Sequence, residues 1–197
     1  MGKSHTTLAI VIHWLFILLY VYGIFKQIDE LEQLSNPSLL IFEVIFASLF
    51  LLIVVMRYFY MRQFDTFQGA TVSIPKIHKF FAKTVHSLMY LCLILLPITG
   101  LMIAGLFTQG YTNEEGLILS SVLLLHGLSA DLSYLLIAIH VGAAIWSRIK
   151  GEGVWSSMVP VWKGEIATKN KTIIRISRYE NKLYNKMESM ITSSKKY

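Results

Sequence analysis

The stretch LLLHGLSADLSYLLIAIHVG, residues 123–142, is apolar enough for a bilayer and yet carries two histidines, His126 and His140. Their spacing of fourteen residues advances an α-helix by about 21 Å and turns it through nearly four complete turns. Both imidazoles are therefore expected on one face of a single helix, directed at opposite ends of a membrane-spanning segment. Ionisable groups inside a membrane are energetically costly and tend to be retained for function, so the stretch points to a functional membrane helix.

The whole chain shares this apolar character, since 54% of its 197 residues are apolar and only 15% are charged. Soluble domains carry about 25% charged residues, so the composition indicates a membrane protein. Four apolar runs, at residues 7–25, 38–56, 85–106 and 122–147, reach or approach the roughly 20 residues that cross a bilayer. Because backbone in hydrocarbon must satisfy its own hydrogen bonds, the sequence predicts an all-α, integral membrane four-helix bundle.

The charges between these runs predict how the helices are oriented. Residues 26–37 and 107–121 are acidic on balance, whereas residues 57–83 hold five Lys or Arg against one Asp. From Arg148 onward the chain holds eleven Lys or Arg against four Glu. Basic segments stay in the cytoplasm, so both termini are predicted to be cytoplasmic, and the net charge of +6 needs no nucleic-acid partner.

The predicted domains are a transmembrane domain over residues 1–160 and a basic cytoplasmic tail over residues 161–197. The basic tail is expected to lie near anionic lipid, with a docking surface for a partner as the alternative. Residues 165–197 form either a polar surface helix or a disordered segment, and the sequence does not decide between them. Upstream, Ser73 and Pro75 predict that the third long helix begins in water near residue 75.

Three histidines are expected near the basic side of the membrane. His140 lies about 12 Å and His13 about 9 Å from that boundary, if helices rise 1.5 Å per residue, and His86 is shallower on the same side. A low-spin haem needs two axial nitrogens from facing helices, and depth alone permits any two of the three. A metal site, a proton relay or ordinary snorkelling histidines are the alternatives. The single cysteine, Cys92, excludes covalent c-type haem attachment and cysteine-rich metal sites.

Four segments together resemble the prokaryotic cytochrome b561 family, which also includes b-type subunits of nickel-iron hydrogenases and formate dehydrogenases. The segments are IVIHW (10–14), VHSLMYLCLILLPITGLM (85–102), HGLSADLSYLLIAIHVGAAIW (126–146) and EGVWSSMVP (152–160). The resemblance covers residues 7 to about 160. It implies a multi-pass protein of the bacterial inner membrane, with one b haem near each membrane face, that passes electrons between a quinone pool and another redox partner.

Carried over by position, the resemblance implies that His13 and His140 ligate the iron of an inner haem. An outer haem would use His126 and a histidine early in the second helix, but that position is Glu43. A carboxylate is a hard ligand that is costly to bury, so one haem b is expected and a second is the alternative. Glu43, His126 and Asp131 are instead candidates for a polar cluster, a proton path or a small metal site, and Glu43 alternatively points to the headgroups.

The position of His86 matches a histidine of the family's third helix, and we assign it to quinone contact or to the surroundings of the haem, with axial ligation as a second option. Arg57, Lys83 and Arg148 lie near the basic boundary, where haem propionates need cations. Plain positive-inside anchoring explains the same three charges.

The function implied is that of a membrane b-type cytochrome that transfers electrons between a quinone and a one-electron partner such as superoxide. Oxidoreductase activity is left open. One alternative is a haem-bearing anchor subunit of a peripheral oxidoreductase, and another is a family member that has lost its haem and has a structural, transport or sensing role. The partners expected are a quinone or other small redox molecule, membrane lipid, and an oxidoreductase subunit or a second copy of the chain.

Overall fold

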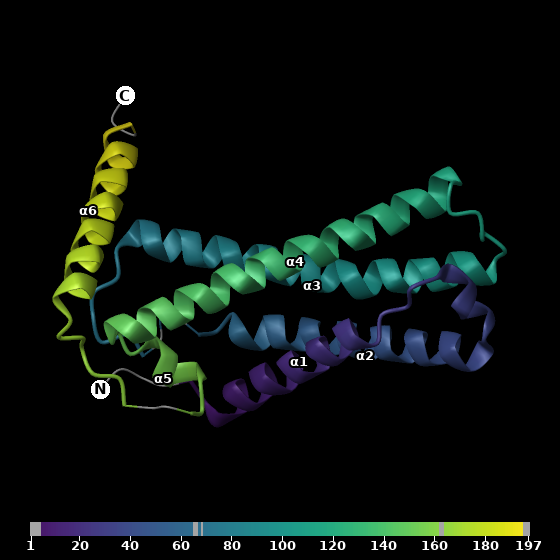
Figure 1. Cartoon of the computed structure of the whole chain (residues 1–197), viewed down its shortest axis with the longest axis horizontal. Coiled ribbons are helices and arrows are strands. Elements are labelled where there is room, and N and C mark those ends of the chain that lie inside the picture. Colours follow the sequence, from purple (N-terminus) through teal and green to yellow (C-terminus); the bar gives the residue numbers. More distant parts are fainter. Residues whose placement is uncertain (1–4, 65–66, 68, 162–163, 195–197) are drawn as a thin grey trace. The chain divides into compact units, whose positions relative to one another are not determined.

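A computed structural model of the chain describes residues 5–64, 67, 69–161 and 164–194. In chain order, its elements are α1 (Thr7–Phe25), η1 (Leu31–Ser35), α2 (Pro37–Met61), α3 (Lys76–Thr108), α4 (Leu117–Lys150), α5 (Val154–Met158) and α6 (Lys171–Ser194) (Figure 1). The described residues contain helices and no strand. The predicted all-α fold is confirmed.

Helices α1 to α4 are each long and apolar enough to cross a membrane. They contain the four predicted apolar runs, and α3 begins at Lys76, where the preceding Ser and Pro predicted its start. Many large apolar side chains on them are exposed, among them Leu18, Leu52, Leu124 and Leu135. Apolar surface of this extent is unfavourable in contact with water. The chain is therefore a multi-pass membrane protein whose exposed helix faces contact lipid.

The ends of the helices follow from local sequence. Asn36 caps α2 by accepting a 3.0 Å hydrogen bond from the backbone N–H of Ser38, and Pro37 occupies the first helical position. After α4, Gly151 has a φ of 75°, and a Cβ there would lie 2.2 Å from the carbonyl oxygen of Ile166. Only glycine tolerates both conditions, so Gly151 lets the chain turn directly after α4.

Contacts divide the chain into two compact units. The first, here called the four-helix unit, comprises residues 11–62 and 88–137 and takes segments from all four long helices. The second, here called the tail unit, comprises the described residues of 1–10, 63–87 and 138–197. The predicted domain boundary near residue 160 stays a prediction.

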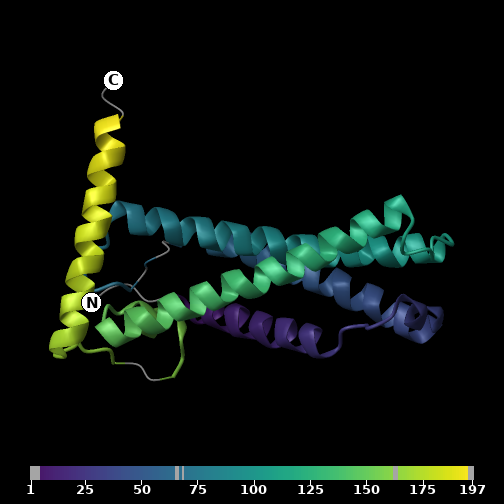
Figure 2. The ribbon, with the colours of Figure 1, turned by 45° about the horizontal axis from the view of Figure 1, so that its top comes forward.

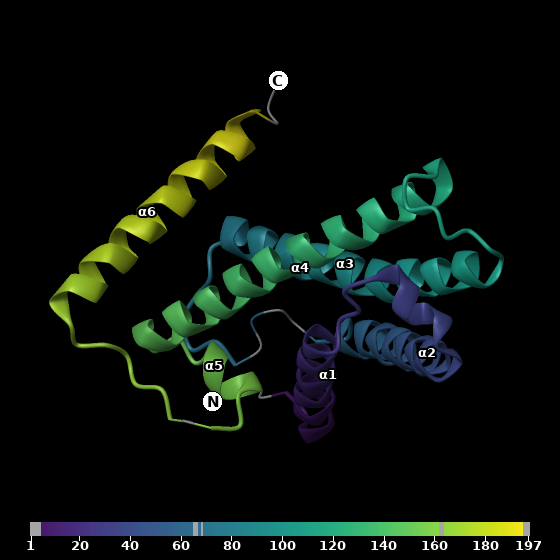
Figure 3. The same ribbon diagram turned by 45° about the vertical axis from the view of Figure 1, so that its right-hand side comes forward.

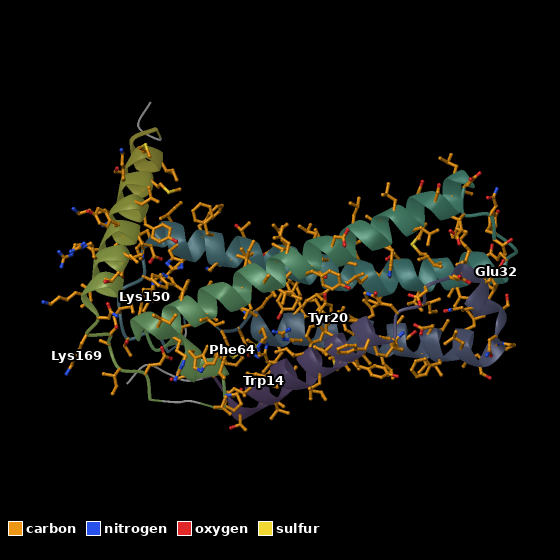
Figure 4. The ribbon with its side chains drawn as sticks, in the orientation of Figure 1. Trp14, Tyr20, Glu32, Phe64, Lys150 and Lys169 are labelled. Atoms are coloured by element: carbon orange, nitrogen blue, oxygen red, sulfur yellow. The ribbon has the colours of Figure 1, made fainter. Side chains whose placement is uncertain are left out.

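The four-helix unit has a small aromatic and aliphatic core. Phe16 of α1, Phe50 and Val54 of α2 and Leu93 of α3 are buried against one another. The hydroxyl of Tyr20, labelled in Figure 4, lies 2.7 Å from Oγ of Ser133 and so links α1 to α4. Helices in lipid associate through close packing and interhelical hydrogen bonds, and this unit shows both.

In the tail unit, α6 is attached to the ends of two membrane helices. Nε1 of Trp146 donates a 3.0 Å hydrogen bond to Glu180, and Nζ of Lys150, a residue labelled in Figure 4, lies 3.2 Å from the same carboxylate. The Tyr184 ring stacks on His78 of α3 with centroids 4.9 Å apart, and burial raises the pKa of its hydroxyl, so the ring stays neutral. Residues 171–194 are thus a helix, which settles the alternative that the sequence left open for this part of the tail.

The path of α6 differs from that of α4. Figures 1 and 2 show α6 running across the C-terminal end of α4 instead of continuing its direction. The short helix α5 lies beside the same end of α4 (Figure 3). The tail unit therefore turns the chain away from the membrane-spanning direction once α4 has ended.

Candidate functional site

His86 of α3 and His140 of α4 lie in contact within the tail unit. Their ring centroids are 4.8 Å apart and their planes meet at 79°, edge to face. Nδ1 of His86 is 2.7 Å from the carbonyl oxygen of Ala82. Because a carbonyl only accepts, Nδ1 of His86 carries the proton, and the lone pair of the neutral ring is on Nε2.

This contact bears on which histidines can share an iron. Metal–imidazole bonds of about 2 Å on the two faces of one haem hold the ring centroids roughly 6 Å apart or more. The centroids of His86 and His140 are closer than that. His86 and His140 would therefore not hold one iron from opposite faces of a haem in this arrangement, and a haem held by either would take its second axial nitrogen from elsewhere in the chain.

His13, the remaining candidate on α1, belongs to the four-helix unit and contacts Arg57 of α2. A terminal guanidinium nitrogen of Arg57 lies 2.5 Å from Nδ1 of His13. A guanidinium has only donors, so Nδ1 of His13 accepts, and the neutral ring carries its proton on Nε2. His13 and His140 belong to different compact units, and their pairing on one iron stays a prediction.

Arg57 is a buried cation in an apolar place. The residue is 8% exposed, and its guanidinium carbon lies 4.9 Å from the centroid of the Phe16 ring and 5.5 Å from that of Tyr90. Among the described residues its Nε has no hydrogen-bond partner, and no carboxylate forms an ion pair with it. A buried charge normally has a counter-ion, so an anionic group from outside the chain would satisfy Arg57.

The haem implied by the resemblance would fit these residues once Arg57 no longer donates to Nδ1 of His13. Ligation of an iron through Nε2 of His13 would require the ring proton to be on Nδ1. Arg57 would then donate its hydrogen bond to another acceptor. A haem propionate is such an acceptor, and guanidinium–carboxylate pairs are among the strongest charge-assisted hydrogen bonds. The other cations predicted near propionates differ from Arg57: Lys83 is exposed, and the guanidinium of Arg148 lies over the Trp155 ring.

His126 of α4 lies at the other end of the four-helix unit with Thr99 of α3 as its partner. Nδ1 of His126 is 2.8 Å from Oγ1 of Thr99. That hydroxyl donates to the carbonyls of Leu95 and Leu96, at 2.7 and 3.0 Å, so it accepts from Nδ1 of His126 and leaves the lone pair on Nε2. Such an outer partner fixes the tautomer that a metal ligand needs.

Thr99 went unnoticed in the sequence because it is one uncharged residue within an apolar run. The only available signal was the Thr99–Gly100 pair. A Cβ at Gly100 would lie 3.7 Å from Cε1 of His126, so this small residue lets the α3 backbone approach the ring.

Glu43 has a partner that the sequence did not predict. Its carboxylate forms an ion pair with Lys26, and the ammonium lies 4.2 Å from the centroid of the Phe46 ring. The second oxygen, Oε1, is buried and has no hydrogen-bond partner among the described residues. Glu43 therefore directs its charge to a cation of its own unit.

The structure gives Glu43 and His126 different partners, and Asp131 is exposed. Over the part of the chain that the structure describes, no group of three or more His, Cys, Asp or Glu residues is arranged to hold a metal ion. A small metal site at this end, which the sequence left open, is not found among those residues.

Comparison with known proteins bears on the whole membrane region. A family model described as prokaryotic cytochrome b561 matches residues 4–161. No curated protein and no solved structure matches the chain. The family match covers α1 to α4 with His13, His86, His126 and His140, and it ends before α6.

Proposed function

Because the chain belongs to the prokaryotic cytochrome b561 family and is a membrane b-type cytochrome of electron transfer, we propose that it binds one haem b through His13 and His140. The haem lies toward the side on which α1 begins and α4 ends. This is the cytoplasmic side of a bacterial inner membrane, so both termini are cytoplasmic. Electrons pass between a membrane quinone and a one-electron partner such as superoxide.

The observation that carries this proposal is the buried Arg57 against His13. An apolar site that held only protein would gain stability from an uncharged residue in place of a buried guanidinium without a carboxylate partner. Arg57 would neutralise a haem propionate, and its contact with His13 would bring that cation beside the proposed ligand. His86 supports His140 in turn, since its edge-to-face contact restricts the orientation of the His140 imidazole.

The residues then have separate tasks. Bound haem supplies one-electron chemistry between ferric and ferrous iron. His13 and His140 hold the iron, Arg57 neutralises a propionate, and the aromatic neighbours Phe16 and Tyr90 keep water from the guanidinium. Nε2 of His86 carries the lone pair while Nδ1 donates to Ala82, and this nitrogen would accept a proton from a reduced quinone.

We propose a single haem because of the Lys26–Glu43 pair. The second ligand of an outer haem would stand at Glu43, but a carboxylate paired with an ammonium is a poor iron ligand. His126 has a suitable tautomer and no histidine opposite it in α2.

Alanine variants of two histidines test the ligand assignment. His140→Ala is expected to remove the b-type Soret and α bands from purified protein, because one axial nitrogen is lost. His126→Ala, on the same helix, is the matched control and is expected to retain both bands. Far-UV circular dichroism shows whether each variant keeps its helices. Equal loss of the bands in two folded variants would overturn the assignment.

A further inference from the structure

Helix α6 lies beyond the family match and has three distinct faces. One face packs within the tail unit and consists of Ile173, Ser177, Glu180 and Tyr184. These residues recur at four- and three-residue intervals, the spacing of one helix face. Glu180 and Tyr184 on this face make the contacts to α4 and α3. This face therefore fixes how α6 is rotated about its own axis.

The second face is an exposed apolar strip. It consists of Ile176, Tyr179, Leu183 and Met190, which are between 48% and 66% exposed. Their spacing of three, four and seven residues aligns them along the helix. A helix surrounded by water gains nothing from such a strip, so it has to be covered by something apolar.

The third face is basic. It is made by Lys171, Arg175, Arg178, Lys182 and Lys186, again at intervals of three and four residues. On a helical projection this basic strip lies beside the apolar strip and opposite the packed face. The acidic residues of α6 lie elsewhere: Glu180 is bound to Trp146 and Lys150, and Glu188 lies outside the strip.

The attachment of α6 fixes where these faces are presented. Trp146 and Lys150 belong to the last turns of α4, and His78 belongs to the first turn of α3. Those turns are the ends of two membrane-spanning helices, so α6 is held at a membrane boundary. Its direction across the end of α4 (Figures 1 and 2) is the direction of a helix that lies along a surface.

We propose that α6 is an interfacial helix that binds the anionic phospholipid surface on the side where α4 ends. Its apolar strip inserts at the boundary between headgroups and acyl chains, and its basic strip attracts acidic headgroups. Helices with an apolar face and a Lys- and Arg-rich polar face bind membranes in this way, and basic groups next to a membrane helix favour anionic lipid. The proposal does not depend on haem.

Two single-cysteine labels on the full-length protein test the proposal. In a Cys92→Ala background, Leu183→Cys places a nitrobenzoxadiazole label on the apolar strip, and Asn185→Cys places one on the opposite side of α6. In nanodiscs that contain phosphatidylglycerol, acrylamide is expected to quench the label at 183 several-fold less than the label at 185. In phosphatidylcholine nanodiscs this difference is expected to shrink.

A charge variant separates the two strips. Replacement of all five basic residues by Gln, on the Leu183→Cys background, is expected to abolish the effect of phosphatidylglycerol. Equal quenching at the two positions in anionic nanodiscs would overturn the proposal. Shielding of position 183 that changes neither with lipid charge nor with the five substitutions would also overturn it. Shielding that appears only in native membranes would assign the strip to a protein partner, which also overturns it.

Discussion

Near the C-terminal end of α2, single residues decide the chemistry, and Arg57 is the clearest example. The sequence gives Arg57, Lys83 and Arg148 the same description, as cations near one boundary. The structure separates them, because only Arg57 is buried, contacts a candidate ligand and has a nitrogen without a partner among the described residues. Which way a side chain faces depends on how helices pack, and no local pattern contains that information.

Substitution of Arg57 is predicted to weaken haem binding. Arg57→Met removes the proposed propionate partner and is expected to lower the haem-to-protein ratio several-fold. Haem that remains is expected to have a lower reduction potential, because a nearby positive charge favours the ferrous state. Arg57→Lys keeps the charge without the planar donor pair, so its haem content and reduction potential are expected to lie between those of the wild type and Arg57→Met. Haem content and a spectroelectrochemical titration measure both effects.

The control for Arg57 is Arg62, the residue that follows the last residue of α2. Arg62→Gln removes an exposed cation just past α2 and is expected to leave haem content and potential unchanged. Full haem content with an unchanged potential in Arg57→Met would refute the role given to this guanidinium.

At the scale of the helices, an element was predictable from the sequence where its formation depends on its own composition. Helices α1 to α4 were predictable because each apolar run must form a helix in lipid. Whether the tail is helical or disordered was not predictable, because α6 is held by contacts with Trp146, Lys150 and His78, which are far away in the sequence. The ion pair of Glu43 with Lys26 was unpredictable for the same reason, since the two residues are 17 positions apart in the sequence.

The turn after α4 gives a prediction at this scale. Gly151→Ala combines a positive φ of 75° with a Cβ only 2.2 Å from the Ile166 carbonyl oxygen, and a strained backbone of this kind costs about 1–3 kcal/mol. We expect faster tryptic cleavage between α4 and α6. Gly164→Ala is the matched control, with a φ of 88° and no atom within 4 Å of the added Cβ, so its effect should be smaller. Equal cleavage rates would show that the contact with Ile166 does not hold this turn.

For the whole molecule, the family and the membrane fold were predictable from the sequence, whereas the state of each histidine was not. The proton of His126 is on Nδ1 because of its contact with Thr99, and the proton of His86 is on Nδ1 because of the Ala82 carbonyl. The proton of His13 is on Nε2, because Arg57 donates to its Nδ1. Each is a contact in space, and together they give these three histidines different protonation states. One haem on the basic side, with the opposite end closed by Lys26 and Glu43, is the account that these contacts support.

The number of haems per chain tests this account most directly. It is measured by pyridine haemochrome on purified, detergent-solubilised protein produced with ample haem, with a dithionite-reduced minus oxidised spectrum of the same sample. The account predicts about one b haem per polypeptide with the spectrum of a low-spin centre. Two haems would show that the Lys26–Glu43 end still accepts a porphyrin, and none would show that the Arg57 site serves another purpose; either result would contradict the account.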